Sequence, residues 1–357
     1  MADGTAPRLQ RITDYPALLA EAWGQHLAPR DANAPTVIST FAGCGGSSLG
    51  YSMAGFRELL AVEWEQNAAD TFRLNFPHVP LYHGDIAKLS VEECLRLAGV
   101  APGELDVFDG SPPCQGFSTA GKREMGDQRN QLFREFVRLL SGLRPRAFVM
   151  ENVSGMVKGD FKVIFAEILR TLKACGYRVK VRLLNAMCFG VPQSRERMIF
   201  VGVRDDLGVE PSHPSGWSEP ISIATAIAGV STDAQELAAL RAAATKYATY
   251  SKWDAMMPGQ SRQDLGETSG FSCVKLNPRR PCPTILKTDG QLSTHGKMHW
   301  ADKRRPTVSE FKRWGSFPDA YRTTGDFGQG VERIGNSVPP LLMRSIARHV
   351  RTLVARG

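Results

Sequence analysis

The sequence predicts an α/β fold in which a mostly parallel sheet carries helices on both faces, together with a smaller second domain. Three observations support this prediction. The β-branched run 36–41 enters the glycine-rich stretch 42–48 and then a helix-like segment. Further short apolar runs alternate with amphipathic segments, which is typical of parallel strands joined by helices. Polar residues directly follow several of these runs, at the strand ends where α/β sheets gather their ligands.

The composition is that of an ordinary globular protein of 357 residues, with 42% hydrophobic and 22% charged residues. No apolar run approaches the roughly 20 residues that a membrane span needs, and no secretory signal is visible at the N-terminus. The chain has seven cysteines, and no two of them have CxxC spacing. We therefore expect a reducing compartment and no bound metal.

Positive charge is concentrated in one stretch. The net charge is +8, and residues 271–305 hold eight basic side chains against two aspartates. The basic residues are Lys275, Arg279, Arg280, Lys287, Lys297, Lys303, Arg304 and Arg305. Such a cluster is the electrostatic footprint of a protein that binds a polyanion such as nucleic acid. A solvated basic face would leave the same pattern, so the cluster alone decides nothing.

The first 34 residues are rich in alanine and proline. They predict one short helix, with Asp14 as its N-cap before Pro16. Nothing in this segment points to chemistry, so we expect an N-terminal extension.

The first predicted strand, 36–41, leads into Gly43 and Gly45, which let a backbone turn approach a ligand closely. The turn lacks the GxGxxG spacing of dinucleotide sites, and the chain has no GxxxxGK[ST] phosphate loop. A glycine-rich turn alone is weak evidence for a nucleotide.

The next two predicted strands end in carboxylates. The strand at 59–62 is followed by Glu63 and Trp64, where a carboxylate accepts hydrogen bonds from ribose hydroxyls and an indole packs on a purine. The strand at 79–82 is followed by Asp85, which would accept from an adenine amino group. Together these strand ends favour an adenosine ligand that needs no phosphate clamp.

A cysteine follows the next apolar run, 105–108. The two prolines before Cys114 fix the backbone and remove two donors, so they stiffen the loop that presents the thiol. A stiff loop with one thiol suits a nucleophile, although a lone cysteine beside a turn is more often structural. The polar segment 119–130 predicts a loop that closes over substrate, and an amphipathic helix follows at 131–140.

A second carboxylate lies at the end of the predicted strand 147–150, where Glu151 is a candidate acid. A helix is expected at 161–174, stopped by Gly176. Two further strands are predicted at 177–184 and 197–203.

Eight segments in order resemble the motifs of the cytosine-5 DNA methyltransferase family, in its bacterial restriction-modification form. They are the segments 41–46, 63–64, 84–86, 112–118, 151–153, 192–197, 304–318 and 335–339. The resemblance covers about 36–204 and 303–357. It implies a Rossmann-like S-adenosylmethionine-dependent methyltransferase domain and a smaller target-recognition domain.

The resemblance also implies the chemistry. Cys114 would add to carbon 6 of a cytosine that has been flipped out of the duplex. Glu151 would hydrogen-bond the ring nitrogen and the exocyclic amine, and carbon 5 would take the methyl group. Arg197, together with Arg195, would contribute positive charge that favours the thiolate and contacts the base.

The remaining site residues follow by the same resemblance. Those expected at the cofactor are Phe41, Gly43, Gly45, Glu63, Trp64, Asp85, Ile86, Pro113, Leu132 and Asn336. Those expected at DNA are Gln115, Ser118, Lys122, Arg123, Arg129, Arg279, Arg280, Lys287, Arg304 and Arg305. Most of the basic ones should contact phosphates rather than bases.

The expected organisation has five parts. They are an extension at 1–34, a cofactor-binding and catalytic domain at 35–204, a target-recognition domain at 205–302, a hinge with the late motif at 303–332, and a segment at 333–357 that returns to the catalytic domain. The recognition domain should hold a helix near 234–247, and a last helix near 340–353 should pack on the first domain.

Two alternatives stay open: a tRNA methyltransferase on the same scaffold and a catalytically silent DNA-binding relative. The Cys-Phe-Thr tripeptide of the tRNA enzymes is absent, and Cys114, Glu151 and Arg197 are all present. We expect a monomer of the bacterial cytoplasm or nucleoid that binds double-stranded DNA. A cognate restriction endonuclease would act separately, without forming a stable complex.

Overall fold

The computed structural model describes residues 9–113, 131–153, 161–266, 273–293 and 296–355. The chain divides into two compact units. The sheet unit comprises Gln25–Asn185, Glu196–Ser215 and Met343–Gly357. The second unit comprises Met1–Gly24, Ala186–Arg195 and Gly216–Leu342.

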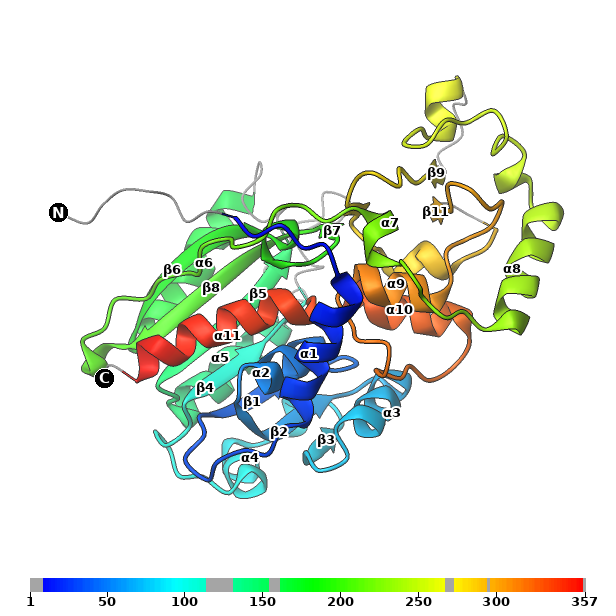
Figure 1. Cartoon of the computed structure of the whole chain (residues 1–357). Coiled ribbons are helices and arrows are strands. Elements are labelled where there is room, and N and C mark those ends of the chain that lie inside the picture. The colour runs from blue at the N-terminus through cyan, green and yellow to red at the C-terminus, as the bar shows by residue number, and fades with distance from the viewer. Residues whose placement is uncertain (1–8, 114–130, 154–160, 267–272, 294–295, 356–357) are drawn as a thin grey trace. The chain divides into compact units, whose positions relative to one another are not determined.

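Seven strands of the described chain form the sheet of the sheet unit, in the order β3-β2-β1-β4-β5-β8-β6 (Figure 1). Their bounds are β1 Thr36–Thr40, β2 Arg57–Glu63, β3 Leu81–His83, β4 Val107–Gly110, β5 Ala147–Val153, β6 Tyr177–Asn185 and β8 Glu196–Arg204. Strands β1 to β5 pair in parallel, whereas β8 runs antiparallel to both β5 and β6. The carboxyl ends of β1 to β5 therefore meet at one edge, and β8 begins at that edge.

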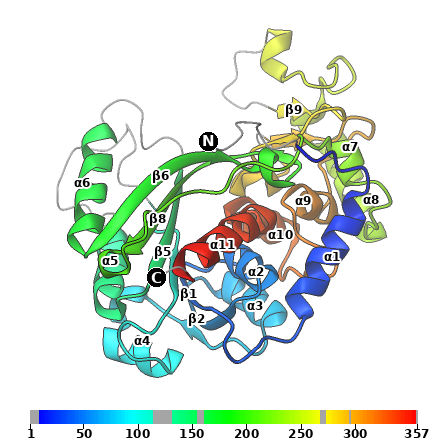
Figure 2. The same ribbon diagram turned by 60° about the vertical axis from the view of Figure 1, so that its left-hand side comes forward.

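Helices cover both faces of this sheet, which confirms the predicted fold class (Figure 2). Their bounds are α2 Gly46–Met53, α3 Gln66–Asn75, α4 Val91–Ala98, α5 Gln131–Leu143 and α6 Phe161–Ala174, with a 3₁₀ turn, η1, at Ile86–Lys88. Helices α5 and α6 lie on one face, and α2 lies on the other with the end of α11, Pro340–Val354. The sequence encodes their ends: Ser90 caps α4 by accepting from the N–H of Glu93, and Gly99 closes it in the left-handed conformation.

The core of the sheet unit lies between the sheet and α4–α6. Aromatic rings form a continuous row through it, from Phe108 to Phe136, Phe148 and Tyr177, with successive centroids 4.8, 6.2 and 5.3 Å apart. All five residues of β1 are buried because the strand is covered on both faces. Such a strand has no solvent face, and so it has no alternating pattern in the sequence.

The second unit has shorter elements. Its strands are β7 Gln193–Ser194, β9 Cys273–Lys275, β10 Cys282–Pro283 and β11 Gly296–Met298, and its helices are α7 Ile223–Ala226, α8 Ala234–Lys246, α9 Val308–Trp314 and α10 Phe327–Asn336. Its 3₁₀ turns are η5 Ala186–Phe189, η7 Ala248–Tyr250, η8 Arg262–Leu265 and η9 Lys287–Gly290, whereas η6 Asp205–Leu207 belongs to the sheet unit. A small core gathers Tyr250, Met256, Cys273 and Met298 against Trp253.

The N-terminal segment is better packed than the sequence suggests. The predicted cap is confirmed: helix α1, Tyr15–Leu27, begins after Asp14, whose carboxylate accepts from the N–H of Ala17 at 2.9 Å. Tyr15 is buried and donates to the carbonyl of Arg313 at 3.2 Å. Of this segment, the described residues 9–24 belong to the second unit.

The C-terminal helix lies partly in the sheet unit. From Met343 onward α11 belongs to the sheet unit, where Arg146 donates to the carbonyl of Val354 at 2.6 Å. Within the described residues, no helix has the length and apolarity needed to cross a lipid bilayer.

Candidate active site

A cavity of about 490 Å³ opens at the carboxyl edge of β1, β2 and β3 in the sheet unit. Its lining residues are Phe41, Val62, Glu63, Trp64, Gly84, Asp85, Ile86, Pro113, Gln131 and Leu132. Seven of these were predicted from the sequence as cofactor residues, and the sheet gathers them from segments far apart in the chain. Val62, Gly84 and Gln131 were not predicted, although each directly adjoins a predicted residue.

Glu63 organises the inner end of this cavity. Its carboxylate accepts from the backbone N–H groups of Gly43 at 2.7 Å, Trp64 at 2.9 Å and Glu65 at 2.8 Å. The first of these bonds ties the glycine turn after β1 to the end of β2. Because this holds the turn in place, Phe41 keeps a left-handed φ of 54°, which costs a non-glycine residue about 1–2 kcal/mol.

The outer wall of the cavity offers an aromatic face and a second carboxylate. Trp64 is 76% exposed, whereas tryptophan side chains in folded proteins are mostly buried. The Nε2 atom of His83 lies 3.2 Å from the carbonyl oxygen of Trp64. Asp85 accepts from the N–H of Ala87 at 3.0 Å, so its carboxylate sits at the start of η1 beside Ile86.

This lining fits an adenosine-type ligand. It combines an exposed indole and apolar side chains with two carboxylates that can accept from hydroxyl and amino groups. Among the described residues, the lining contains no lysine or arginine that could bind a phosphate group.

A second constellation lies at the ends of β5 and β8. Val153 pairs with Arg197 in the antiparallel register, and Glu151 lies two residues earlier on the same face. The Nε of Arg197 is therefore 2.6 Å from the carboxylate of Glu151. Both side chains are almost enclosed, at 13% and 12% exposure. The sequence predicted both residues, and the structure brings them into contact.

Asn152 is a residue of this site that sequence reasoning did not single out. It is buried, and its amide donates to the carbonyl of Pro112 at 3.2 Å while its oxygen accepts from the N–H of Val153. Asn152 thus fixes the first of the two prolines that lead toward Cys114. Its place directly after Glu151 in a strand-end motif was the only available signal.

Several predicted residues lie outside the described residues. They are Cys114, Gln115, Ser118, Lys122, Arg123 and Arg129. Of the predicted catalytic set, only Glu151, Arg195 and Arg197 are therefore described.

Arg195 is buried within the second unit rather than presented to a ligand. Its guanidinium donates to the carbonyls of Ile285 at 3.0 Å and Gly335 at 2.9 Å. The predicted catalytic role is corrected to a structural one, because these carbonyls already hold the fork of the side chain. Asn336 also belongs to the second unit, where its amide lies 3.5 Å from the carboxylate of Glu332, so its predicted cofactor contact stays a prediction.

The predicted DNA contacts of Arg304 and Arg305 are wrong. Arg304 forms a bidentate ion pair with Glu310, with both bonds at 2.8 Å, and is 5% exposed. Arg305 is 0% exposed and donates to the carbonyls of Lys297 and Gln291. Both cations hold the second unit together.

The basic stretch is therefore only partly a surface feature. Lys275 lies 3.6 Å from the ring centre of Trp253, and Lys297 is buried in an ion pair with Asp289. Arg279, Arg280 and Lys287 are exposed, as a phosphate contact requires.

Beneath the glycine turn, the sheet unit buries two carboxyl groups. Burial raises the pKa of Asp109 well above its usual range, and the Tyr51 hydroxyl donates to it at 3.2 Å. Burial likewise raises the pKa of Glu58 to about 7, opposed by the hydroxyls of Ser39 and Ser48. Asp109 lies in β4, the strand that precedes the two prolines before Cys114.

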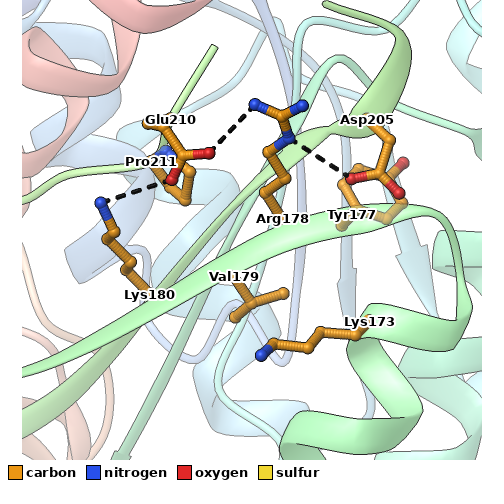
Figure 3. Close-up of a pocket in the computed structure, with 8 residues that line it drawn as sticks. All are labelled: Lys173, Tyr177, Arg178, Val179, Lys180, Asp205, Glu210 and Pro211. Atoms are coloured by element: carbon orange, nitrogen blue, oxygen red, sulfur yellow. Dashed lines mark hydrogen bonds and ion pairs between the residues drawn. The ribbon is translucent and has the colours of Figure 1, made fainter. Parts of the chain in front are cut away.

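A second hollow, beside the edge strand β6, contains paired charges rather than a reactive constellation (Figure 3). Arg178 lies between Glu210 at 3.0 Å and Asp205 at 4.0 Å, and Lys180 pairs with Glu210 at 3.5 Å. Charged side chains of this kind keep an exposed edge strand from pairing with another chain.

The raised pKa of Glu58 predicts a pH dependence of stability. The folded state holds a proton up to about pH 7, whereas the unfolded chain releases it near 4.5. The free energy of unfolding contributed by this group is therefore complete below pH 4.5 and falls as the pH rises toward 7. In urea titrations at several pH values, the free energy of unfolding of the Glu58→Gln variant should lack this decline. If it falls between pH 4.5 and 7 as steeply as in the parent protein, the assignment is contradicted.

The family model for C-5 cytosine-specific DNA methylase matches residues 35–352. The Type II methyltransferase M1.HphI of Haemophilus parahaemolyticus is 36% identical, over 88% of this chain and 86% of its own. M.NgoPII of Neisseria gonorrhoeae is 31% identical, over 93% and 100%.

Solved structures agree in fold. A prophage-encoded protein of E. coli, named as a DNA modification methyltransferase, superposes with a TM-score of 0.73 at 24% identity, over 90% of this chain and all of its own. Dnmt2 of S. pombe gives 0.61 at 18% identity, over 90% and 98%. With a family model that spans nearly the whole chain and relatives that match along most of it, the protein belongs to the C-5 cytosine-specific DNA methylases and is a DNA (cytosine-5) methyltransferase.

Proposed function

We propose that this methyltransferase acts on a cytosine flipped out of duplex DNA, through a covalent bond between Cys114 and carbon 6 of the base. The observation that carries the proposal is the Glu151–Arg197 ion pair at the strand edge where Asn152 holds Pro112. Cys114 follows Pro112 by two residues. The nucleophile and the acid would therefore belong to one constellation.

The bonds change in a defined order. The thiolate of Cys114 adds to carbon 6, and carbon 5 becomes nucleophilic as negative charge develops on the ring. Glu151 hydrogen-bonds the ring nitrogen and the amino group. A proton passed along the first of these bonds to the ring nitrogen neutralises this charge, and it returns to Glu151 when the thiolate leaves. After carbon 5 has gained the methyl group, water takes its proton and the thiolate leaves carbon 6.

The cavity at β1–β3 would hold the methyl donor. S-adenosylmethionine, when bound, supplies an electrophilic methyl group. Glu63 would accept from the ribose hydroxyls, Asp85 from the adenine amino group, and Trp64 would lie on the purine. These roles agree with the carboxylates and the exposed indole that line the described part of the cavity.

Arg197 would act on two groups. Paired with Glu151 at 2.6 Å, it orients the carboxylate toward the base. It also brings a positive charge to the region where the thiolate must form, and a thiolate near a guanidinium has a lower pKa than a free thiol.

Carbon 6 is inaccessible inside a duplex, so the base must leave the helix. In the recognition region, Arg279, Arg280 and Lys287 would contact phosphates, because they are exposed and charged. The relatives are Type II methyltransferases, which favours a place in a restriction-modification system, with a separate endonuclease and a monomeric methyltransferase.

A tRNA substrate on the same scaffold is the second candidate. Dnmt2 structures share the fold at 18% identity, which carries no substrate information. The higher identity to Type II methyltransferases along most of the chain favours DNA.

The decisive experiment uses duplex DNA containing 5-fluorocytosine. Fluorine at carbon 5 cannot leave as a proton does, so the bond to Cys114 should persist and shift the protein on a denaturing gel. Cys114→Ala should abolish the shift, while Cys175→Ala, a change at a partly exposed cysteine outside the site, should retain it. Trapping on tRNA but not on duplex DNA would overturn the DNA assignment.

Glu151→Gln tests the acid. The change keeps the shape of the side chain but leaves it unable to pass a proton to the base, so single-turnover methylation should slow by roughly 10²- to 10⁴-fold. Glu196→Gln alters an exposed carboxylate on β8 next to Arg197 and should leave the rate unchanged. A Glu151→Gln rate within about threefold of the parent would remove Glu151 from the mechanism.

The salt dependence of DNA binding tests the basic surface. Removing Arg279 and Arg280 together should reduce the slope of log K against log salt by about 0.9 for each lost phosphate contact. Arg96→Ala removes an exposed arginine from α4 of the sheet unit and serves as the control. Equal slopes for all three proteins would exclude these arginines from the interface.

A further inference from the structure

One arginine outside the cavity joins its two walls. Arg138, in α5, donates from Nη2 to the carbonyls of Ile86 at 3.0 Å and Leu89 at 2.8 Å. Its Nε pairs with Glu135 at 2.6 Å. Ile86 and Leu89 are the first residue and the C-cap of η1.

The two elements that Arg138 joins both line the cavity. Asp85 caps η1 and, with Ile86, forms part of the lining. Gln131 and Leu132, at the start of α5, form another part. Since Arg138 lies two turns along α5 from Gln131, it fixes the spacing between η1 and α5 without lining the cavity itself.

A three-residue 3₁₀ turn cannot hold this position alone, because its few hydrogen bonds have poor geometry. Its two backbone bonds run from the N–H of Lys88 to the carbonyl of Asp85 at 2.9 Å and from the N–H of Leu89 to the carbonyl of Ile86 at 3.2 Å. Charge-assisted bonds from a guanidinium are roughly twice as strong as neutral ones. Arginine suits the place because one planar fork can serve two carbonyls and a carboxylate at once.

We propose that Arg138 is a positioning residue for the methyl donor, which holds Asp85 and Ile86 at the distance from Leu132 that the adenine ring requires. This inference rests on the proposed function, since it assumes that the cavity binds S-adenosylmethionine. Without the hydrogen bonds from Arg138 to Ile86 and Leu89, η1 moves relative to α5 and cofactor binding weakens. The chemistry at Glu151 is unaffected once the cofactor is saturating.

The chain offers a closely matched control. Arg204 donates from Nη1 to the carbonyls of Gly103 and Arg144, at 3.3 and 2.6 Å, and pairs with Asp206 at 2.7 Å. It ends β8, where Val203 faces Ala147, the first residue of β5. It therefore makes the same kinds of bonds at the opposite edge of the sheet.

The test compares Arg138→Gln with Arg204→Gln in the full-length protein. Calorimetric titration with S-adenosylhomocysteine should show binding about tenfold weaker for Arg138→Gln, the loss expected for about one charge-assisted hydrogen bond. Arg204→Gln should bind like the parent, although thermal unfolding should show comparable destabilisation of the two variants. In steady-state assays, Arg138→Gln should raise KM for S-adenosylmethionine and leave kcat and KM for DNA unchanged.

A double-mutant cycle separates positioning from general stability. If Arg138 acts through Asp85, the losses for Arg138→Gln and Asp85→Asn should be less than additive. Should Arg138→Gln fail to fold, Arg138→Lys, which keeps the charge but not the fork, carries the same comparison with a smaller loss.

The outcomes distinguish failure of the proposed function from failure of the positioning role of Arg138. A parent protein that binds neither S-adenosylhomocysteine nor S-adenosylmethionine overturns the proposed function. A parent that binds while Arg138→Gln binds equally well, or while Arg204→Gln loses as much, overturns the positioning role alone.

Discussion

The hydrogen-bonded register of β1 with its two neighbours is the constraint on which the rest of the sheet unit depends. Thr40 lies opposite Val62 of β2 and Gly110 of β4, so three strands end at the same level. The glycine turn, Glu63 and the proline loop therefore begin side by side. A fully buried β1 holds this register firmly, because slipping by one residue would turn its side chains into the opposite layer.

This arrangement places acidic groups where water is scarce. Glu63 is stabilised by three backbone donors, whereas Asp109 and Glu58, beneath the same turn, have pKa values raised by burial. The site thus keeps one carboxylate well supplied with donors for ligand binding and holds two carboxyl groups that favour their protons.

Much of the fold could be predicted from the sequence, because the β-branched run 36–40 leads into a glycine-rich turn and the apolar run 147–150 ends abruptly in Glu151 and Asn152. The cavity residues could also be predicted, since strand ends meet at one edge. The errors have a common cause. Arg304, Arg305 and Arg195 look like ligand-binding cations in a sequence, but their partners are a carboxylate in the next helix or main-chain carbonyls, which no side-chain pattern encodes. Arg138 was missed for the same reason.

The reversed direction of β8 has a consequence for how this family can vary. Glu151 and Arg197 meet because two strands of opposite polarity share one ladder, so their contact depends on strand length as well as on residue identity. Deleting or inserting a single residue between Ala147 and Glu151, or between Arg197 and Val203, would rotate one partner to the other face of the sheet. Substitutions can accumulate along both strands, but changes in length cannot, and loops must absorb every insertion.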